Sequence, residues 1–234
     1  MGRAPAPPGS SARRALIGPY AGATLGELVF SELTLFDRAT PTVDPAFAAL
    51  TRVHLDDRSW VDVVPDWLQG ADTVAEELTD RLPWRQRRDV PMYDSFVDEP
   101  RLSSWWRTAD GVGEPLPVLA EIRRLLSDRY RVRFDSIGFN LYRDGEDSVA
   151  WHGDRHRRHV VDPVVAIVSV GQARTLRLRP RVAAGPRRSQ AWRLGHGHLF
   201  VMGGACQHEW EHCVPKSSAG VGPRISITFR HGAR

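Results

Sequence analysis

Two residues near the middle of the chain have the types and the spacing of metal ligands. His152 and Asp154 flank Gly153, and residues two apart on a strand point to the same side. One imidazole and one carboxylate, joined by a distant second imidazole, occupy three adjacent corners of an octahedron and leave three open. This arrangement is typical of non-haem Fe(II) sites. The pattern therefore predicts an iron site with room for further ligands.

Several histidines could supply the distant imidazole, because the chain has nine. His208 and His212 are the rival candidates, four residues apart. His196 lies between two glycines, so we expect it to have a structural role in a turn. The spacing alone leaves the choice between His208 and His212 open.

The last strand-like segment, residues 224–230, carries two arginines on one face. Alternation places four polar residues opposite three apolar ones: Arg224, Ser226, Thr228 and Arg230 against Ile225, Ile227 and Phe229. Guanidinium groups match carboxylates in bidentate fashion. We therefore expect a sheet that buries its apolar face and binds a dicarboxylate with the other.

A second strand repeats this division. Within residues 136–143, Asn140 and Tyr142 share a face, and Phe139 and Leu141 share the opposite one. Both polar side chains can donate hydrogen bonds to an organic acid. We expect them to face the metal and the arginines.

Strands dominate the second half of the chain. We expect them at 136–143, 164–170, 175–179, 198–202 and 224–230, separated by glycine-marked turns. In the first half we expect a strand over 54–64, a short helix over 44–50, and helices from Pro65 to before Pro83 and over 115–128. The fold class is mainly β with flanking helices (α+β), as a β-sandwich or barrel.

Residues 84–110 interleave arginines with aromatic side chains. Arginines neutralise phosphates, and aromatic faces stack on bases. Adjacent strand residues face opposite sides, so we expect at most one of Trp105 and Trp106 to be buried. The alternative is that these aromatic residues belong to the core.

Composition sets wider limits. The chain has 234 residues, 41% of them hydrophobic, and a net charge of +4. We expect a flexible arm over 1–19 and a single domain over 20–234. The basic charge favours a nucleic-acid partner. We read Cys206 and Cys213 as reduced and expect a cytoplasmic monomer with no membrane segment.

The segment from Phe139 to Arg234 resembles the AlkB family of Fe(II)- and 2-oxoglutarate-dependent nucleic-acid dealkylases. The match rests on the order and spacing of several motifs together, and weaker similarity extends back to about Val90. The motifs are Asn140-Leu141-Tyr142-Arg143-Asp144-Gly145, His152-Gly153-Asp154, Gly197-His198-Leu199, Trp210-Glu211-His212 and Pro223-Arg224-Ile225-Ser226-Ile227-Thr228-Phe229-Arg230.

The resemblance implies a role for each of these positions. It implies that His152, Asp154 and His212 hold Fe(II), which selects His212 over His208. It also implies that 2-oxoglutarate is a cosubstrate alongside O2. Five residues would bind 2-oxoglutarate. Arg224, with Tyr142, would bind its distal carboxylate, and Arg230, with Asn140, would lie near the carboxylate that chelates iron. Ser226, between the two arginines in the sequence, would be the fifth. No catalytic residue beyond the metal ligands is implied.

The resemblance also implies a fold and a substrate. The fold is a double-stranded β-helix, or jelly roll, with a catalytic core over 136–234 and an N-terminal nucleotide-recognition lid over about 84–110. The implied activity is oxidative dealkylation of N-alkylated bases in DNA, with RNA as the alternative, which directly reverses alkylation damage. The substrate contacts that we predict are Tyr93, Trp105, Trp106 and His156.

Two positions depart from the family pattern. Ser226 stands where the family commonly has asparagine, and His156 stands where it has an acidic residue. A basic loop at the pocket mouth disfavours a cationic methylated base. Two alternatives therefore stay open: the same oxygenase core acting on RNA, protein or a small molecule, or a non-catalytic nucleic-acid-binding module.

Overall fold

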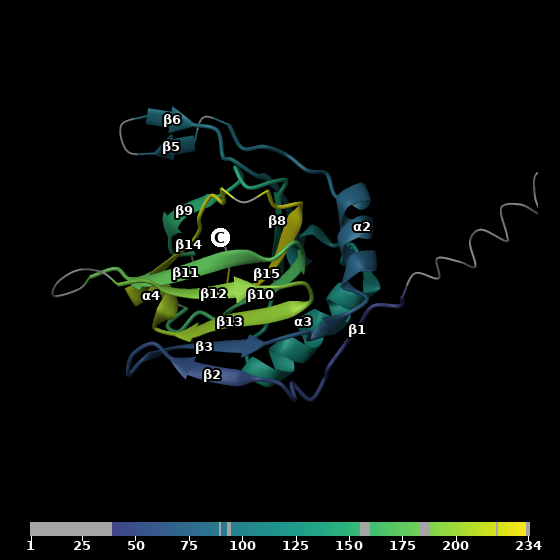
Figure 1. Ribbon diagram of the computed structural model, residues 1–234. Helices are drawn as coiled ribbons and strands as arrows, with labels where there is room; N and C mark the ends of the chain where they lie inside the picture. Colours follow the sequence, from purple (N-terminus) through teal and green to yellow (C-terminus); the bar gives the residue numbers. More distant parts are fainter. Residues whose placement is uncertain are drawn as a thin grey trace, which may run out of the picture. The chain divides into compact units, whose positions relative to one another are not determined.

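The structure is a computed structural model that describes residues 39–88, 90–92, 95–154, 160–182, 188–218 and 220–232, with only the backbone for residues 90–92 and 95–97. These residues belong to one unit, Arg38–Arg234. The predicted arm at 1–19 lies outside them. Two β-sheets and two main helices make up the architecture (Figure 1).

The larger sheet has seven strands in the order β2-β3-β13-β10-β15-β8-β7, and neighbouring strands are antiparallel. In that order they are β2 (Thr51–His54), β3 (Ser59–Val64), β13 (His198–Gly204), β10 (Val165–Gly171), β15 (Arg224–Arg230), β8 (Ser136–Tyr142) and β7 (Leu102–Arg107). The order is far from the sequence order, so each central strand lies between segments distant in the chain.

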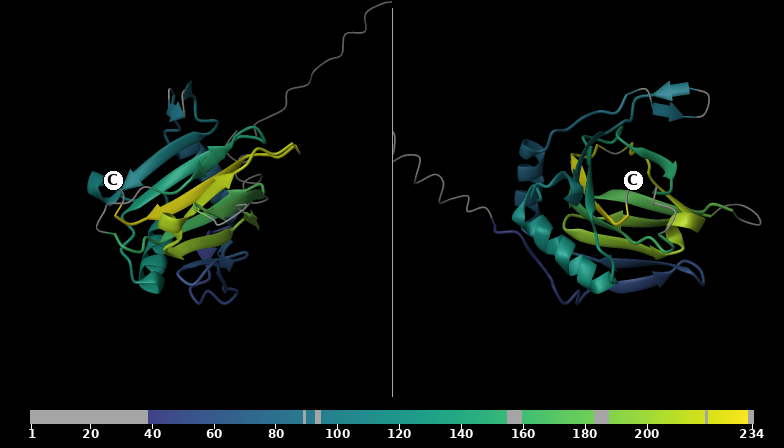
Figure 2. Two further views of the ribbon diagram at one scale, coloured as in Figure 1. Left: turned by 90° about the vertical axis from the view of Figure 1, so that its left-hand side faces the viewer. Right: turned by 180° about the vertical axis from the view of Figure 1, so that it is seen from behind.

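The smaller sheet has four antiparallel strands in the order β12-β11-β14-β9. They are β12 (Gln190–Leu194), β11 (Arg174–Pro180), β14 (Trp210–Val214) and β9 (Val149–His152). Two further strand pairs are β1 (Thr42–Val43) with β4 (Leu68–Gln69), and β5 (Val90–Met92) with β6 (Ser95–Val97). The β5–β6 hairpin stands off from both sheets, on the side of β9 (Figures 1 and 2).

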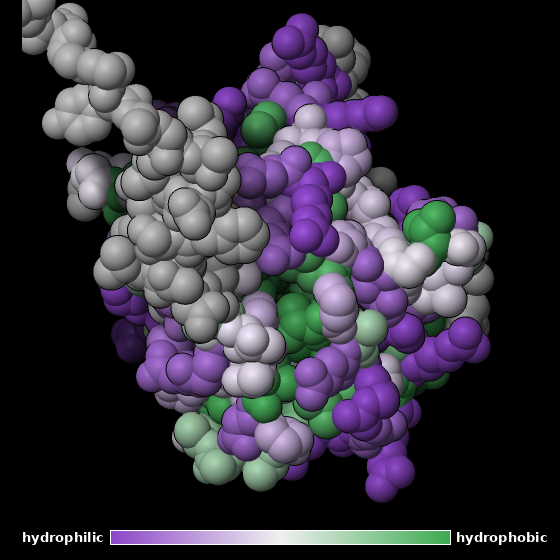
Figure 3. Space-filling model, turned by 90° about the vertical axis from the view of Figure 1, so that its right-hand side faces the viewer, coloured by the Kyte–Doolittle hydropathy of each residue, from purple (hydrophilic) through white to green (hydrophobic). Residues whose placement is uncertain are grey.

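The helices are α2 (Ala71–Arg81), α3 (Pro117–Tyr130), the short α4 (Cys206–Glu209) and the 3₁₀ turn η1 (Thr108–Asp110). Helices α2 and α3 bury one apolar stripe each, including Val74 and Leu78 on α2 and Ile122 and Leu126 on α3. The face of the molecule that carries them is mostly hydrophilic, with apolar groups visible between the polar ones (Figure 3). No described helix is long and apolar enough to cross a membrane.

The core is divided into two layers by the larger sheet. One layer joins α2 and α3 to the apolar face of the sheet, which includes Phe139, Ile227 and Phe229. The other layer lies between the two sheets and includes Ile167 and Phe200 from the larger sheet and Leu178 from the smaller one. Two sheets packed face to face confirm the predicted jelly-roll core.

The strands of the second half were largely predicted, and β15 has the predicted bounds. Strands β12 and β14 of the smaller sheet were not predicted. A strand end was expected to carry both His152 and Asp154, but β9 ends at His152 and Asp154 lies beyond it. These strands are short and mixed in polarity, with few fully buried positions on β9 and β12, so alternation over a few residues gives a weak signal. Strand β7 places residues 102–107 of the predicted lid at the edge of the larger sheet.

Three local predictions in the first half were wrong. No helix forms over 44–50, because the Asp44 carboxylate accepts hydrogen bonds from the backbone of Ala46 and Ala48 in a turn, and Phe47 has a φ of 53°. Helix α2 starts at Ala71 and not at Pro65, because Leu68–Gln69 pairs with β1 and Gly70 is left-handed, with a φ of 64°.

The third concerns residues 54–64, which were predicted as one strand. The chain turns between His54 and Ser59, so this segment contributes to two strands of a hairpin, β2 and β3. The Asp56 carboxylate holds the turn by accepting hydrogen bonds from the backbone of Arg58 and Ser59, at 2.9 and 2.7 Å.

Candidate metal centre and active site

Three potential metal ligands converge at one end of the smaller sheet. His152 ends β9, His212 lies opposite it on β14, and Asp154 follows two residues after the end of β9. One ligand atom from each lies within 4.8 Å of the others. The two imidazole rings have centroids 4.2 Å apart, and His212 Nε2 is 4.0 Å from Asp154 Oδ2. The sequence-predicted triad is therefore brought together.

Neighbouring groups fix how the ligands are presented. The His152 Nδ1–H donates to the carbonyl of Ala150 at 2.8 Å, which leaves Nε2 with its lone pair free. The backbone N–H of Asp154 donates to Gln207 Oε1 at 3.3 Å. A Cβ at Gly153 would lie 1.9 Å from Arg181 Nη2, so a larger residue between the ligands would require the Arg181 side chain to move.

Electrostatics keep the buried ligands in metal-binding form. Burial alone raises the pKa of the Asp154 carboxyl, but the Arg230 guanidinium and two imidazoles outweigh it, so this pKa lies well below its usual range. Burial, with His152 nearby, lowers the pKa of His212 to about 3. At neutral pH, Asp154 is therefore ionised and His212 is neutral, as metal ligands must be.

Strand β15 places both predicted arginines on the face that looks toward the smaller sheet. Arg230 Nη2 donates to Asp154 Oδ1 at 2.8 Å, which ties the strand to the metal ligand. Arg224 is buried, and its Nε donates to the Ser169 hydroxyl at 2.9 Å. Burial lowers the pKa of the Arg224 guanidinium, and the adjacent Tyr142 acts against that shift.

The remaining predicted cosubstrate residues lie on the same face. Tyr142 is opposite Arg224 and Asn140 is opposite Ser226 in the register of β8 and β15. The guanidinium carbons of Arg174 and Arg224 lie 5.5 and 5.3 Å from the Tyr142 ring centroid, so the phenol is held between two cations. All five predicted cosubstrate residues are thus brought to one surface.

Apart from the Ser59 and Thr108 hydroxyls, which are not part of this site, three buried side-chain atoms of the described residues make no hydrogen bond, and these three belong to the site. They are Asp154 Oδ2, Arg224 Nη1 and Arg230 Nη1. Buried polar atoms are almost always paired, so orphans of this kind need an explanation. A cation explains the carboxylate oxygen, and a dicarboxylate explains the two guanidinium nitrogens. The residues present therefore fit Fe(II) and 2-oxoglutarate.

The rival histidines are engaged elsewhere. His208 Nε2 contacts the carbonyl of Val161 at 2.8 Å and is exposed. His196 accepts a hydrogen bond from the backbone of Gly171 at 2.9 Å, in agreement with its expected role in a turn. His198 lies 3.6 Å from an Asp66 carboxylate oxygen.

The predicted substrate contacts have different outcomes. Trp105 is 47% exposed on β7 and lies against the site, with the Arg230 guanidinium carbon 5.1 Å from its ring centroid. Trp106 is 5% exposed, and its indole N–H donates to the carbonyls of Val112 and Gly113. Trp106 therefore belongs to the core, which corrects the prediction. Tyr93 and His156 lie outside the described residues.

Sequence reasoning missed several residues that support the site. Ser169 had a signal, because it is a polar residue inside the apolar run of β10, whose other members are buried. Arg101, which donates to the Asn140 amide oxygen, had none. In the sequence, nothing distinguishes Arg174 and Gln207 from ordinary surface residues. In the structure, the Arg174 guanidinium donates to three backbone carbonyls.

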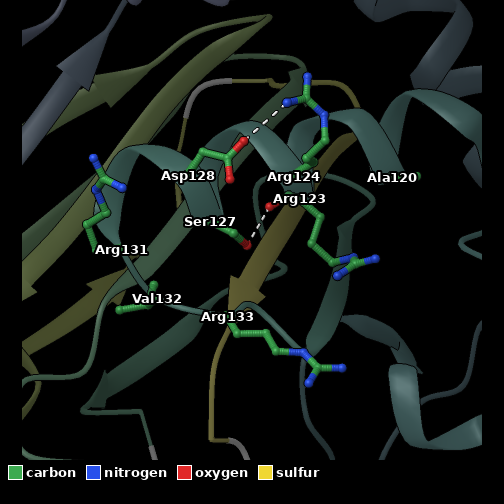
Figure 4. Close-up of a pocket in the computed structure, with 8 residues that line it drawn as sticks. All are labelled: Ala120, Arg123, Arg124, Ser127, Asp128, Arg131, Val132 and Arg133. Carbon is green, nitrogen blue, oxygen red and sulfur yellow. Dashed lines mark hydrogen bonds and ion pairs between the residues drawn. The ribbon is translucent and has the colours of Figure 1, made fainter.

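A separate hollow lies at the C-terminal end of α3. Its volume is about 500 Å³, and it is lined by residues of α3 and the turn after it: Ala120, Arg123, Arg124, Ser127, Asp128, Arg131, Val132 and Arg133. The arginine side chains point in different directions and do not converge (Figure 4). None of these residues belongs to the triad or to the cosubstrate set, so this hollow is distinct from the candidate active site.

The fold and the site define the class of the protein. A jelly-roll core holding a 2-His-1-carboxylate cluster beside the buried Arg224 and the partly buried Arg230 is the architecture of a 2-oxoglutarate-dependent oxygenase. The sequence model of the 2OG-Fe(II) oxygenase superfamily matches residues 51–230, and the chain belongs to this superfamily. The superfamily implies Fe(II), 2-oxoglutarate and O2 as reactants.

Within the superfamily, the curated relatives confirm the predicted AlkB resemblance. The chain is 32% identical to mouse alpha-ketoglutarate-dependent dioxygenase alkB homolog 3 over 178 residues, covering 70% of this chain and 62% of that protein. It is also 32% identical to the DNA oxidative demethylase ALKBH2 of Arabidopsis thaliana over 199 residues, covering 69% and 62%. The chain spans about three fifths of the length of these relatives.

A solved structure shows the same fold. The structure of OsALKBH1 superposes with a TM-score of 0.52 at 13% sequence identity, over 76% of this chain and 100% of that one. At this identity the likeness concerns the fold alone.

Proposed function

We propose that this protein oxidatively dealkylates N-alkylated nucleobases in DNA, releasing an aldehyde, succinate and CO2. The observation that carries the proposal is the set of three orphaned polar atoms, one on the metal ligand Asp154 and two on Arg224 and Arg230. The names of the relatives, which include DNA oxidative demethylases, support DNA as the substrate.

The residues of the chain have separate tasks in this reaction. His152, Asp154 and His212 hold Fe(II), and Arg224 and Arg230 bind the carboxylates of 2-oxoglutarate. When bound, Fe(II) with O2 and 2-oxoglutarate supplies an oxidant able to hydroxylate an alkyl group. Arg230 also neutralises Asp154, because one of its nitrogens donates to that carboxylate at 2.8 Å.

Trp105 offers a surface for the base. Its ring is about half exposed, and Arg230 is the residue between it and Asp154. An exposed indole next to a reaction centre stacks on a base that has left the duplex or comes from a single strand. Gly138 makes room for this arrangement, because a Cβ there would lie 2.7 Å from Arg230 Nη1 and 3.1 Å from the Trp105 ring.

The proposal is tested by succinate formation from 2-oxoglutarate in protein loaded anaerobically with Fe(II) and then exposed to O2. We expect succinate to increase when an oligonucleotide carrying 1-methyladenine or 3-methylcytosine is added, with loss of the methyl group. His212→Ala should abolish this turnover, whereas His208→Ala, four residues away and outside the site, should not.

Two other results would redirect the proposal. Succinate that ignores every lesion would keep the oxygenase and reject the alkylated-DNA substrate. Iron binding without any conversion of 2-oxoglutarate would favour a non-catalytic nucleic-acid-binding module.

A further inference from the structure

Asn140 occupies the centre of the proposed cosubstrate surface. In the register of the larger sheet it lies between Ser103 on β7 and Ser226 on β15. Its amide oxygen accepts a hydrogen bond from Arg101 Nε at 3.1 Å. Arginine can only donate, so this contact fixes the orientation of the amide, and both N–H groups of Asn140 remain for another acceptor.

Arg101 is itself firmly held. Its side chain is 15% exposed, and its Nη2 lies 3.1 Å from a Glu99 carboxylate oxygen. Its backbone N–H donates to the Glu99 carbonyl at 2.8 Å, and the Pro100 carbonyl next to it accepts from Ser148. The other Glu99 carboxylate oxygen receives Arg87 at 3.1 Å. The Arg101 guanidinium, which orients Asn140, is therefore held in place by the Glu99 carboxylate in the segment just before β7.

We propose that Arg101 is a positioning residue for the cosubstrate. It holds the Asn140 amide oxygen away from the site, so that the amide N–H groups face the acidic cosubstrate. Without Arg101 the amide is free to rotate and can present its oxygen to a carboxylate, which is repulsive. This inference rests on the proposed function, because it assumes that Asn140 binds 2-oxoglutarate.

The test measures the dissociation constant of 2-oxoglutarate by calorimetry in Mn(II)-loaded protein, without turnover. Arg101→Met keeps an unbranched apolar side chain in place of the aliphatic part of arginine and removes the guanidinium with all its donors. We expect it to weaken binding by roughly 5- to 20-fold, which corresponds to the loss of one oriented hydrogen bond. Arg87→Met is the matched control, because Arg87 pairs with the same Glu99 but does not contact Asn140; we expect less than a twofold change.

Two further variants identify the path through Asn140. Asn140→Ala should weaken binding, and adding Arg101→Met to it should have little further effect, because both changes remove the same interaction. Asn140→Asp keeps the acceptor for Arg101 but has no N–H and adds a negative charge, so it should bind 2-oxoglutarate at least as poorly as Asn140→Ala. Thermal unfolding of each variant checks that it is folded.

The possible outcomes distinguish a failure of the Arg101 inference from a failure of the proposed function. Additive losses in the double variant, or unchanged binding in folded Arg101→Met, would overturn the role of Arg101 and leave the enzyme assignment standing. Unchanged binding in Asn140→Ala would overturn the inference together with the assignment of Asn140. A failure of lesion-stimulated succinate, with the pattern of dissociation constants as expected, would overturn only the nucleobase substrate.

Discussion

Residues of the site carry buried polar atoms without a hydrogen-bond partner, and the free-energy cost of burying them is offset only when reactants bind. Arg224 is buried with one nitrogen unpaired, and the Asp154 side chain, which is 8% exposed, has one oxygen unpaired. Removing a polar atom from water without a partner costs about 1–3 kcal/mol, and more when the group is charged. The protein keeps these groups because their partners arrive from outside the chain.

This residue-scale argument predicts that function and stability separate at Arg224. Arg224→Met should weaken 2-oxoglutarate binding by at least about tenfold, the order expected for a lost charge-assisted hydrogen bond. The metal-free variant should lose less than about 1 kcal/mol of unfolding free energy or gain some, because a buried charge that lacks a full set of partners is removed. Calorimetry and denaturant unfolding measure the two effects.

The control is Arg177→Met, at an exposed position of β11. It should change neither quantity appreciably. Normal 2-oxoglutarate affinity in Arg224→Met would show that this arginine does not bind the cosubstrate.

At the scale of the element, the alternation of side chains along one strand directs apolar residues to the core and polar residues to the site. On β15 the apolar residues join α2 and α3 in one core layer, while the arginines face the smaller sheet. Strand β7 repeats the division at the sheet edge, where Trp106 is buried and Trp105 is exposed.

Adjacent tryptophans on β7 should therefore respond in opposite ways. Trp106→Ala should lower the unfolding free energy by about 3–5 kcal/mol, as expected for a large buried aromatic residue. Trp105→Ala should change it by less than about 1 kcal/mol but reduce lesion-stimulated succinate formation, with 2-oxoglutarate affinity unchanged. Denaturant unfolding and the succinate assay distinguish the pair; a large stability loss in Trp105→Ala would contradict the assignment.

At the scale of the whole molecule, the buried His212 and the partly buried His231 connect stability to pH. Burial lowers the pKa of His212 to about 3 and also lowers that of His231. The unfolded chain therefore binds more protons than the folded chain between the folded-state pKa values and about 6.5, so stability falls as pH falls through this range. The pKa of the Asp154 carboxyl also lies well below its usual range, because the Arg230 guanidinium and two imidazoles outweigh its burial, so this carboxylate stays charged throughout that pH range.

The metal-free protein should accordingly be less stable at pH 5.5 than at pH 7.5. Each additional proton taken up on unfolding contributes a slope of at most about 1.4 kcal/mol per pH unit. His231→Gln should reduce this slope, whereas His54→Gln, at an exposed position of β2, should not. Guanidinium unfolding at both pH values provides the measurement, and equal wild-type stability at the two would contradict the expectation.

The sequence by itself determined the local features of this protein. The pairing of His152 with Asp154, both arginines and the alternating faces of β8 and β15 were predicted from residue type and from the two-residue period of a strand, which is a local property. His212 was chosen over His208 only through the family resemblance. The expectation that only one of Trp105 and Trp106 is buried follows from the same rule. The division of the protein into a single domain, its monomeric state and its location in the cytoplasm remain predictions.

Only the tertiary structure decided which distant segments meet. The Arg101–Asn140 contact joins residues 39 positions apart, and the Asp154 backbone is held by Gln207, 53 positions away. Local turns also overrode helical patterns at 44–50 and 65–70, because side-chain hydrogen bonds and pairing with β1 were more favourable there. Long-range contacts such as Arg101–Asn140 and Asp154–Gln207 depend on the order of strands in the sheets, and the local periodicity of the sequence does not encode that order.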